Sequence, residues 1–208
     1  MLPLDVLSIF FFTAITLSLA PGPDNIFVLT QSMLSGKFAG LWVTFGLCTG
    51  LMVHTTAVAL GVAAIFQSSP LAFNILKLLG AAYLIYLAWQ AFTANATELS
   101  QGEKSSLNGL RLYLRGIVMN ITNPKVAIFF LAFLPQFTHE NHGSITLQIM
   151  QLGALFMLAT LIVFGLIACF AGFFRDRMKK SARIQTILNR FAGTVFSVLA
   201  LKLLWIER

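Results

Sequence analysis

Six apolar segments, each long enough to cross a lipid bilayer as a helix, recur along this chain of 208 residues. They cover residues 4–34, 38–66, 70–93, 112–135, 145–173 and 184–206. A helix needs about 20 apolar residues to cross a hydrocarbon core of roughly 30 Å. Only 10% of the residues are charged, whereas a soluble domain carries about 25%. The sequence therefore predicts an all-α integral membrane protein with six transmembrane helices in one domain, residues 1–208.

The basic residues lie mainly between the apolar segments, where cytoplasmic loops of membrane proteins carry them. With both termini outside, the cytoplasmic side receives Lys37, Lys104, Arg111, Arg115 and the six basic residues between Arg175 and Arg190. The outer side receives Lys77, Lys202 and Arg208. This asymmetry favours both termini outside. It also indicates that the net charge of +7 serves membrane topology and contact with lipid, with no role in nucleic-acid binding.

Two stretches of the first half have counterparts in the second half. "PGPDNIFVL" (residues 21–29) aligns with "TNPKVAIFF" (122–130), and "KLLGAAYLI" (77–85) aligns with "RFAGTVFSV" (190–198). The polar stretch 94–111 then reads as a cytoplasmic linker between repeats 1–93 and 112–208. Because each repeat has three helices, the second enters the membrane from the opposite face. This predicts an inverted 3+3 repeat, as in many secondary transporters, although a duplicated structural protein leaves the same pattern.

The first apolar segment is interrupted by Pro21, Gly22, Pro23, Asp24 and Asn25. Proline removes a backbone donor and clashes with the preceding turn, so the helix is expected to break here. Backbone groups freed within a membrane must be buried in protein or line a wet cavity. Proline suits the first position of the resumed helix, and the helix dipole stabilises a carboxylate just after it. Asp24 is therefore either a binding group or the cap of a structural kink.

The fourth segment repeats this interruption with the opposite charge, at Asn120, Asn123, Pro124 and Lys125. A lysine near a helix N-terminus is repelled by the dipole, and in hydrocarbon it costs about 2.5–3.5 kcal/mol on insertion scales. Lys125 lies too far from either segment end to reach water easily. It is therefore expected to have an anionic partner, either Asp24 or the carboxylate of a substrate that also meets the free amides of the broken helix.

The two breaks together place one carboxylate and one ammonium near the middle of the membrane. This pair is complementary to a zwitterion, with Asp24 binding an α-ammonium and Lys125 binding an α-carboxylate. The simpler alternative is a permanent salt bridge between Asp24 and Lys125 that fastens the two halves. The two interpretations are compatible, because a substrate can compete for an internal ion pair.

A chain of this length with "PGPDN" in its first helix and "NPK" in its fourth resembles the LysE/RhtB-type amino-acid exporters. The resemblance extends to "GLCTG" (46–50) and "GAAYLIYLAW" (80–89). It implies an inner-membrane efflux carrier of bacteria for amino acids or close derivatives, driven by the membrane potential or a proton gradient. By position it implicates Pro21 to Asn25 and Asn123 to Lys125, and it implies no cofactor.

Three further polar residues lie inside apolar segments: His54, Thr30 and Gln31. Histidine titrates near physiological pH, so His54 suits proton coupling as well as a hydrogen bond between helices. Thr30 and Gln31 follow Asp24 by one to two turns and either line the same cavity or bond across helices.

Other function classes fit the sequence less well. A cation or metal-ion carrier is the main alternative, but the core offers one acid, where a divalent ion prefers several oxygen ligands. No spacing of Ser18, Asp24 and His54 recommends an enzyme. Cys48 and Cys169 have no metal-ligand spacing. A membrane scaffold without transport activity would leave the charges at both breaks unexplained. Each of these interpretations is compatible with a homo-oligomer.

Overall fold

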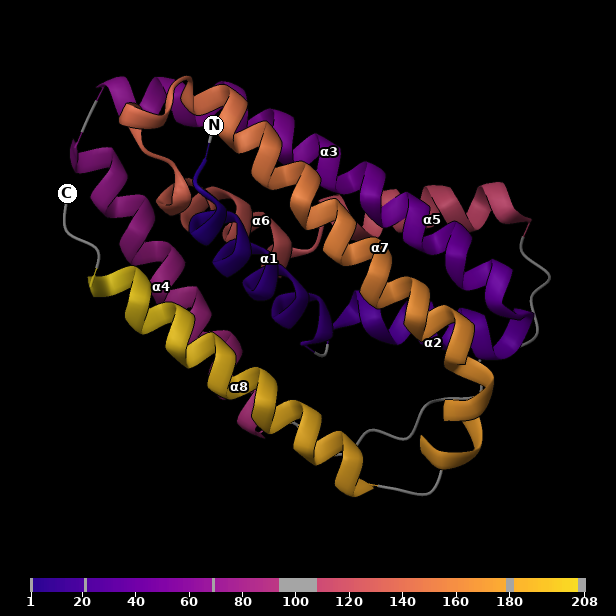
Figure 1. The fold of residues 1–208 in the computed structure, drawn as a ribbon. Coiled ribbons are helices and arrows are strands. Elements are labelled where there is room, and N and C mark those ends of the chain that lie inside the picture. The colour runs from indigo at the N-terminus through magenta and orange to yellow at the C-terminus, as the bar shows by residue number, and fades with distance from the viewer. Residues whose placement is uncertain (1, 21, 69, 94–107, 179–181, 206–208) are drawn as a thin grey trace.

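The computed structural model describes residues 2–20, 22–68, 70–93, 108–178 and 182–205, and every regular element within these ranges is helical (Figure 1). The first half contains α1 (Leu4–Leu19), α2 (Pro23–Ser35), α3 (Lys37–Ser68) and α4 (Pro70–Thr93). The second half contains α5 (Gly109–Ile121), α6 (Pro124–Ile128), a π-helical turn η1 (Phe129–Phe133), the 3-10 turns η2 (Leu134–Phe137) and η3 (Glu140–His142), α7 (Ile145–Met178) and α8 (Ala182–Trp205).

The predicted helical class is confirmed, and both interrupted segments are divided close to their prolines. Two boundaries differ by more than two residues: α7 ends at Met178, beyond the predicted end at residue 173, and the fourth segment begins at Gly109, within the stretch assigned to the linker. The reason is local, since the Asn108 side chain caps this helix by accepting a hydrogen bond of 3.4 Å from the Leu110 amide. Residues 94–107 of the predicted linker lie outside the described ranges, as does Pro21.

In the part of the chain that the structure describes, two helices are long and apolar enough to cross a membrane, Lys37–Gly61 of α3 and Ile145–Ala171 of α7. Two bent pairs raise the number to four: α1 with α2, which differ in direction by 62°, and α5 with Pro124–Phe137, which differ by 51°. Within the described residues, α4 contributes only a shorter apolar helix, Leu78–Thr93. The six-helix inverted repeat thus stays a prediction.

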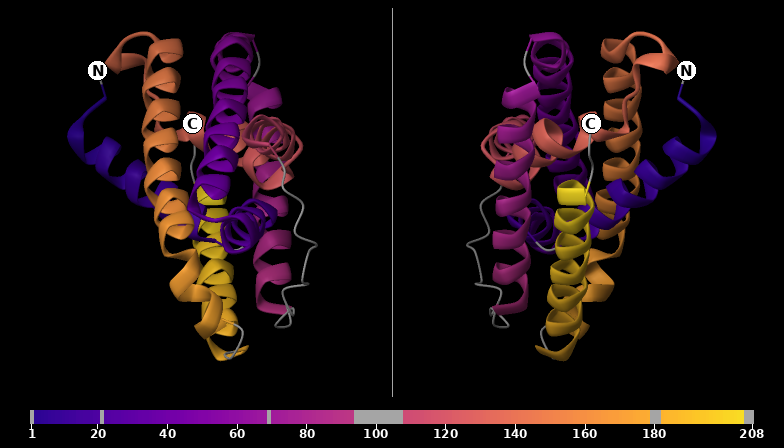
Figure 2. Two further views of the ribbon diagram at one scale, coloured as in Figure 1. Left: turned by 90° about the vertical axis from the view of Figure 1, so that its right-hand side faces the viewer. Right: turned by 90° about the vertical axis from the view of Figure 1, so that its left-hand side faces the viewer.

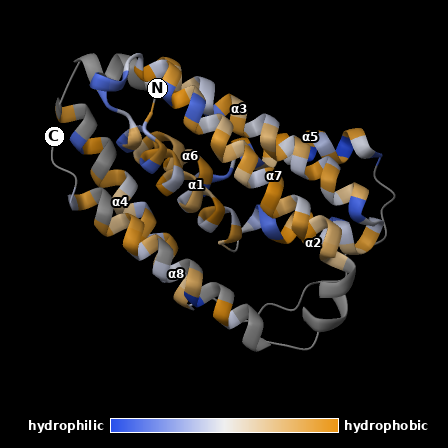
Figure 3. Ribbon diagram, in the orientation of Figure 1, coloured by the Kyte–Doolittle hydropathy of each residue, from blue (hydrophilic) through white to orange (hydrophobic). Residues whose placement is uncertain are grey.

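Large apolar side chains remain exposed on the outside of the bundle, as lipid contact requires. Leu60 of α3, Leu147 of α7 and Leu201 of α8 are 72%, 66% and 66% exposed. Apolar residues cover the faces of these helices in Figure 3. This surface is that of a membrane protein, because a water-soluble chain would not leave so many large apolar side chains uncovered.

The two halves pack against each other along several helices (Figures 1 and 2). Helix α3 contacts both α5 and α7, α4 contacts α8, and α1 contacts α7. The pairs α3–α7 and α4–α8 join corresponding segments of the two predicted repeats. Helix α1 begins and α8 ends at the same end of the molecule (Figure 1).

Among the side chains that the structure describes, the buried apolar ones form two clusters. The large apolar cluster joins α1, α3, α4, α6, η1, η2, α7 and α8. It includes Phe10, Leu17, Val126, Phe129, Phe130, Phe133, Phe137, Phe156 and Phe196. The small apolar cluster joins α2, α3, α5 and α7 and consists of Val28, Ala39, Val43, Leu47, Leu112, Val163, Phe164 and Ala168. In each interrupted segment, the break separates residues of one cluster from residues of the other.

Glycines allow α3 and α5 to approach closely. A Cβ atom added to Gly46 would meet the Tyr113 carbonyl oxygen and would lie 3.0 Å from the Gly116 Cα. A Cβ added to Gly50, one turn later, would lie 2.6 Å from the Asn120 Cβ. Gly46 and Gly50 form a GxxxG pattern, which suits such packing within membranes.

We expect Gly46→Ala to destabilise the protein by roughly 1–3 kcal/mol, because the backbones of α3 and α5 must separate to admit the methyl group. Gly61→Ala is the matched control in the same helix, since a Cβ at Gly61 meets nothing within 4 Å. Thermal unfolding of both variants in detergent measures the difference. Equal melting temperatures would contradict the proposed role of Gly46.

Candidate functional site

The first break is organised by Gly22 and Pro23. Helix α1 ends at Leu19, and Gly22 precedes α2 in an extended conformation. Pro23 occupies the first position of α2, where its missing N–H leaves no intrahelical bond unmade. Asp24 follows in the first turn, where the helix dipole stabilises a negative charge. Figure 3 shows hydrophilic residues at this start of α2, next to the apolar end of α1.

The second break is organised by Asn123 and Pro124. Asn123 caps α6, because its Oδ1 accepts a hydrogen bond of 3.0 Å from the Lys125 amide. Pro124 occupies the first helical position, as Pro23 does in α2. Asn120 lies within the last turn of α5, so the interruption is narrower than expected and is confined to the residues between Ile121 and Pro124.

The fold brings the two breaks into contact. The Asn123 Nδ2 donates a hydrogen bond of 2.8 Å to the Asp24 Oδ2. The Lys125 Nζ donates one of 3.2 Å to the backbone oxygen of Ala20, at the C-terminal end of α1. Asp24, Asn123 and Lys125 are 2%, 3% and 7% exposed. Both predicted charges are therefore buried together at the junction of the two halves.

Each charge is bound by a neutral group of the other half. Asp24 and Lys125 interact electrostatically, but among the described residues no hydrogen bond or ion pair joins their side chains directly. The carbonyl groups at the end of α1 carry the negative end of its dipole and attract the ammonium. The repulsion expected from Lys125's own helix is thus offset by α1, an arrangement that a single helix does not reveal.

Gly22 leaves room for the Lys125 side chain in this geometry. A Cβ atom at Gly22 would lie 2.9 Å from the Lys125 Nζ and 3.5 Å from its Cε. The ammonium therefore passes over the backbone of the first break at a point where a side chain would displace it. Gly22 contributes to the site through the space it leaves open.

Three buried side-chain oxygens at the breaks have no hydrogen-bond partner within the described residues: Asp24 Oδ1, Asn25 Oδ1 and Asn120 Oδ1. Asn25 is fixed by its Nδ2, which donates a bond of 2.7 Å to the Ser18 carbonyl. A buried acceptor without a donor costs about 1–3 kcal/mol. The Asp24 Oδ1 is the one with a formal charge, and it is suited to accept a hydrogen bond from an ammonium group.

His54 contacts the second break through the backbone. Its Nε2 lies 3.2 Å from the Asn120 carbonyl oxygen, which can only accept, so this bond needs a proton on Nε2. The ring also packs against Phe130, with centroids 5.8 Å apart. His54 is thus at the edge of the site, next to the C-terminal end of α5.

Thr30 and Gln31 lie half-buried in α2. Gln31 follows Asp24 by seven residues and shares its helix face, whereas Thr30 points about 120° away. Within the described residues, no side-chain hydrogen bond connects either of them to Asp24 or Lys125. Their role in a cavity stays a prediction.

Sequence reasoning missed two kinds of site group. The Ala20 carbonyl binds Lys125, but backbone acceptors carry no sequence signal beyond the position of a helix end. Phe27 and Arg115 pack together beside the site. In the sequence, Phe27 is one of many apolar residues, and Arg115 is one of several basic residues close to a loop. Arg115 is identified there only by its contribution to topology.

Comparison with known proteins gives consistent matches along almost the whole chain. The family model described as "LysE type translocator" matches residues 15–206. A homoserine/homoserine lactone efflux protein of Salmonella typhimurium is 34% identical over 185 residues, covering 88% of this chain and 88% of the relative. An uncharacterised membrane protein of Vibrio cholerae is 30% identical over 185 residues, covering 88% of this chain and 89% of the relative. No solved structure matches the chain.

Proposed function

Because the chain belongs to the LysE family of translocators, we propose that it is a secondary active exporter of amino acids or close derivatives in the bacterial inner membrane. The observation that carries this proposal is the burial of Asp24 and Lys125 at two helix breaks that contact each other. Broken helices that bind a charged substrate near the midplane are a recurrent device of secondary transporters.

The charges of the site suit a zwitterion. Asp24 and Lys125 together have no net charge, so a bound zwitterion adds none to the membrane interior, where an extra charge is costly. The unpartnered Asp24 Oδ1 accepts from the substrate ammonium. Lys125, which has donors beyond the one directed at Ala20, binds the carboxylate. Gly22, Asn25, Asn120 and Asn123 border these two positions.

The names of the relatives support this substrate class. The Salmonella typhimurium relative is named for the efflux of homoserine and homoserine lactone. Homoserine is a small zwitterion with a neutral side chain, whereas the lactone lacks the carboxylate and shares only the amino group that Asp24 would bind. For the present chain, the proposal extends to amino acids of comparable size.

The driving force in this proposal is the membrane potential or the proton gradient. His54 is the candidate for proton coupling, because its ring contacts the end of α5 at the second break. Loss of the Nε2 proton would remove the donor to the Asn120 carbonyl and so alter a contact between α3 and the site.

Efflux from cells that overproduce this chain tests the proposal. The cells are loaded with single amino acids as dipeptides, and the appearance of each amino acid outside is followed with the proton gradient intact or collapsed. We expect at least tenfold faster efflux of one or more small neutral amino acids than from cells carrying an empty vector. A chain that inserts normally but exports none of the panel would contradict the proposal. Efflux against the concentration gradient of the amino acid that persists after both the membrane potential and the proton gradient are collapsed would exclude secondary active transport driven by either of them.

A further inference from the structure

Phe27 and Arg115 form a contact between the two halves one turn from the proposed site. Phe27 follows Asp24 by three residues and therefore lies on the same side of α2. The guanidinium carbon of Arg115, on α5, lies 4.8 Å from the centroid of the Phe27 ring. Asp24 with Asn123 and Phe27 with Arg115 are thus successive contacts of α2 with the second half of the chain.

The two sides of the site are closed to different extents. On the side of α1 and α6, six phenylalanines of the large apolar cluster pack with neighbouring ring centroids 5.0–6.4 Å apart. On the side of α2 and α5, Phe27 packs at the edge of the small apolar cluster. Arg115 is exposed there, and its guanidinium lies over the Phe27 ring. Separating Phe27 from Arg115 breaks one cation–π contact and leaves the packed aromatic rings of the other side intact, which makes it the less costly opening.

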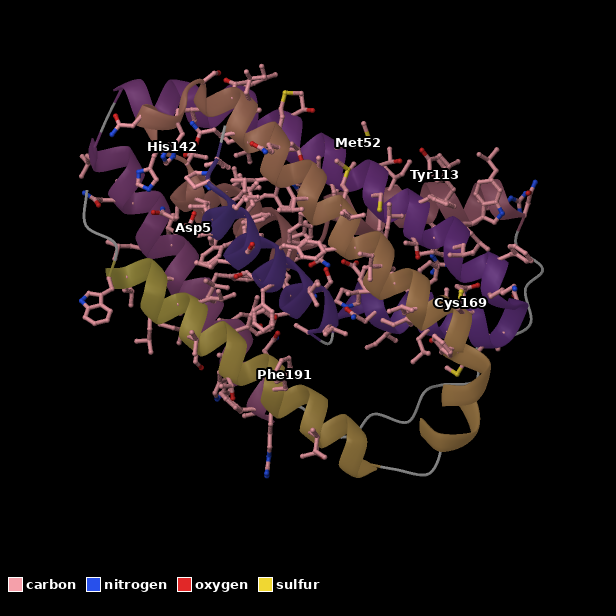
Figure 4. All side chains as sticks on the ribbon, viewed as in Figure 1. Asp5, Met52, Tyr113, His142, Cys169 and Phe191 are labelled. Carbon is pink, nitrogen blue, oxygen red and sulfur yellow. The ribbon has the colours of Figure 1, made fainter. Side chains whose placement is uncertain are left out.

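The side closed by Arg115 is the one that the distribution of basic residues assigns to the cytoplasm. In Figure 4, Tyr113 lies toward one end of the molecule, and Asp5 and His142 lie toward the other end. Tyr113 is two residues before Arg115 in α5. An exporter receives its substrate from the cytoplasm, so the barrier on this side must open at the start of each cycle.

We propose that Arg115 and Phe27 form the cytoplasmic gate of this protein, in which the guanidinium on the ring closes the passage between α2 and α5 that leads to Asp24. A cation–π contact at an exposed position is weak enough to form and break in every cycle. The direction of entry rests on the proposed function. The barrier itself is a property of the fold that is measured without transport.

Accessibility of residue 24 tests the barrier directly. A cysteine is introduced as Asp24→Cys together with Cys169→Ser, because Cys169 is the exposed native cysteine. A membrane-impermeant thiol reagent is then added to inside-out vesicles. We expect Arg115→Ala to accelerate labelling of residue 24 at least fivefold and Arg115→Lys, which keeps a cation, to do so much less. Equal labelling rates with and without Arg115, including no labelling in either, would overturn the gate.

Cross-linking tests the effect on transport. The pair Phe27→Cys and Arg115→Cys is joined by a short, reducible bifunctional thiol reagent in the Cys169→Ser background, and efflux is compared before and after reduction. The matched control is Thr49→Cys with Tyr113→Cys, since these side chains connect α3 and α5 through a hydrogen bond of 2.9 Å outside the proposed passage.

We expect the Phe27–Arg115 cross-link to lower efflux at least tenfold and reduction to restore it, while the control cross-link leaves efflux within twofold. Unchanged efflux in the fully cross-linked Phe27–Arg115 pair would refute the gate while leaving the proposed function intact. If neither the wild type nor any variant, cross-linked or reduced, exports an amino acid, the proposed function is refuted instead. The labelling experiment would still decide whether Arg115 and Phe27 form a gate.

Discussion

Replacing Asp24 by asparagine is expected to reduce amino-acid efflux roughly 10- to 150-fold while the protein still inserts in the membrane. The carboxylate is the proposed acceptor for the substrate ammonium, and a charge-assisted hydrogen bond contributes about 1.5–3 kcal/mol. Asparagine has the same shape, and its Oδ1 can still accept the bond that Asn123 donates. Initial efflux rates, normalised to the amount of protein in the membrane, measure the effect.

Asp24→Glu is the control for this prediction, since it keeps the charge but moves it by one methylene. We expect Asp24→Glu to retain more efflux than Asp24→Asn, because the negative charge at the first break is preserved. If Asp24→Asn protects cells from a toxic amino-acid load as well as the wild type does, Asp24 does not bind the substrate.

Lys125→Met is expected to abolish efflux and also to destabilise the protein. Methionine approximates the length of lysine but loses the hydrogen bond to the Ala20 carbonyl. The buried Asp24 then lacks a compensating cation, and breaking a buried charge pair costs about 3–5 kcal/mol. Efflux assays and thermal unfolding in detergent measure the two effects separately.

The double variant Asp24→Asn with Lys125→Met separates binding from folding. It removes both charges, so we expect most of the stability lost in Lys125→Met to return while efflux stays at background. Transport by this double variant would show that the pair serves only to hold the helices together. The charge swap Asp24→Lys with Lys125→Asp is expected to insert without transporting, because it places a cation at the positive N-terminal end of α2 and an anion against the negative C-terminal end of α1.

The two helix breaks show which structural features follow from the local sequence. Pro23 and Pro124 each occupy the first position of a helix, as expected from the fixed φ angle and missing donor of proline. The burial of Asp24 and Lys125 also agrees with their place inside apolar segments. These features depend on neighbours within a few residues or on hydropathy, which the sequence displays directly.

The hydrogen-bond partners of the charged groups do not follow from the local sequence. An ion pair between Asp24 and Lys125 is one natural expectation, yet Asp24 accepts from Asn123, and Lys125 donates to the end of α1. Asn123 does two things at once, since it caps α6 and binds Asp24. Only the packing of two distant helix ends decides which of several nearby polar groups lies within hydrogen-bond distance.

The sequence by itself therefore determined that this protein is a helical membrane protein, where two of its helices break, and which charges lie at the breaks. The physical reason is the membrane environment, which requires apolar helices and tolerates helix breaks and charges only where protein surrounds them. The tertiary structure decided that the two breaks meet, that each charge is held by a neutral partner, and that Arg115 covers Phe27. Those contacts join residues about a hundred positions apart, and their distances follow from how the helices pack.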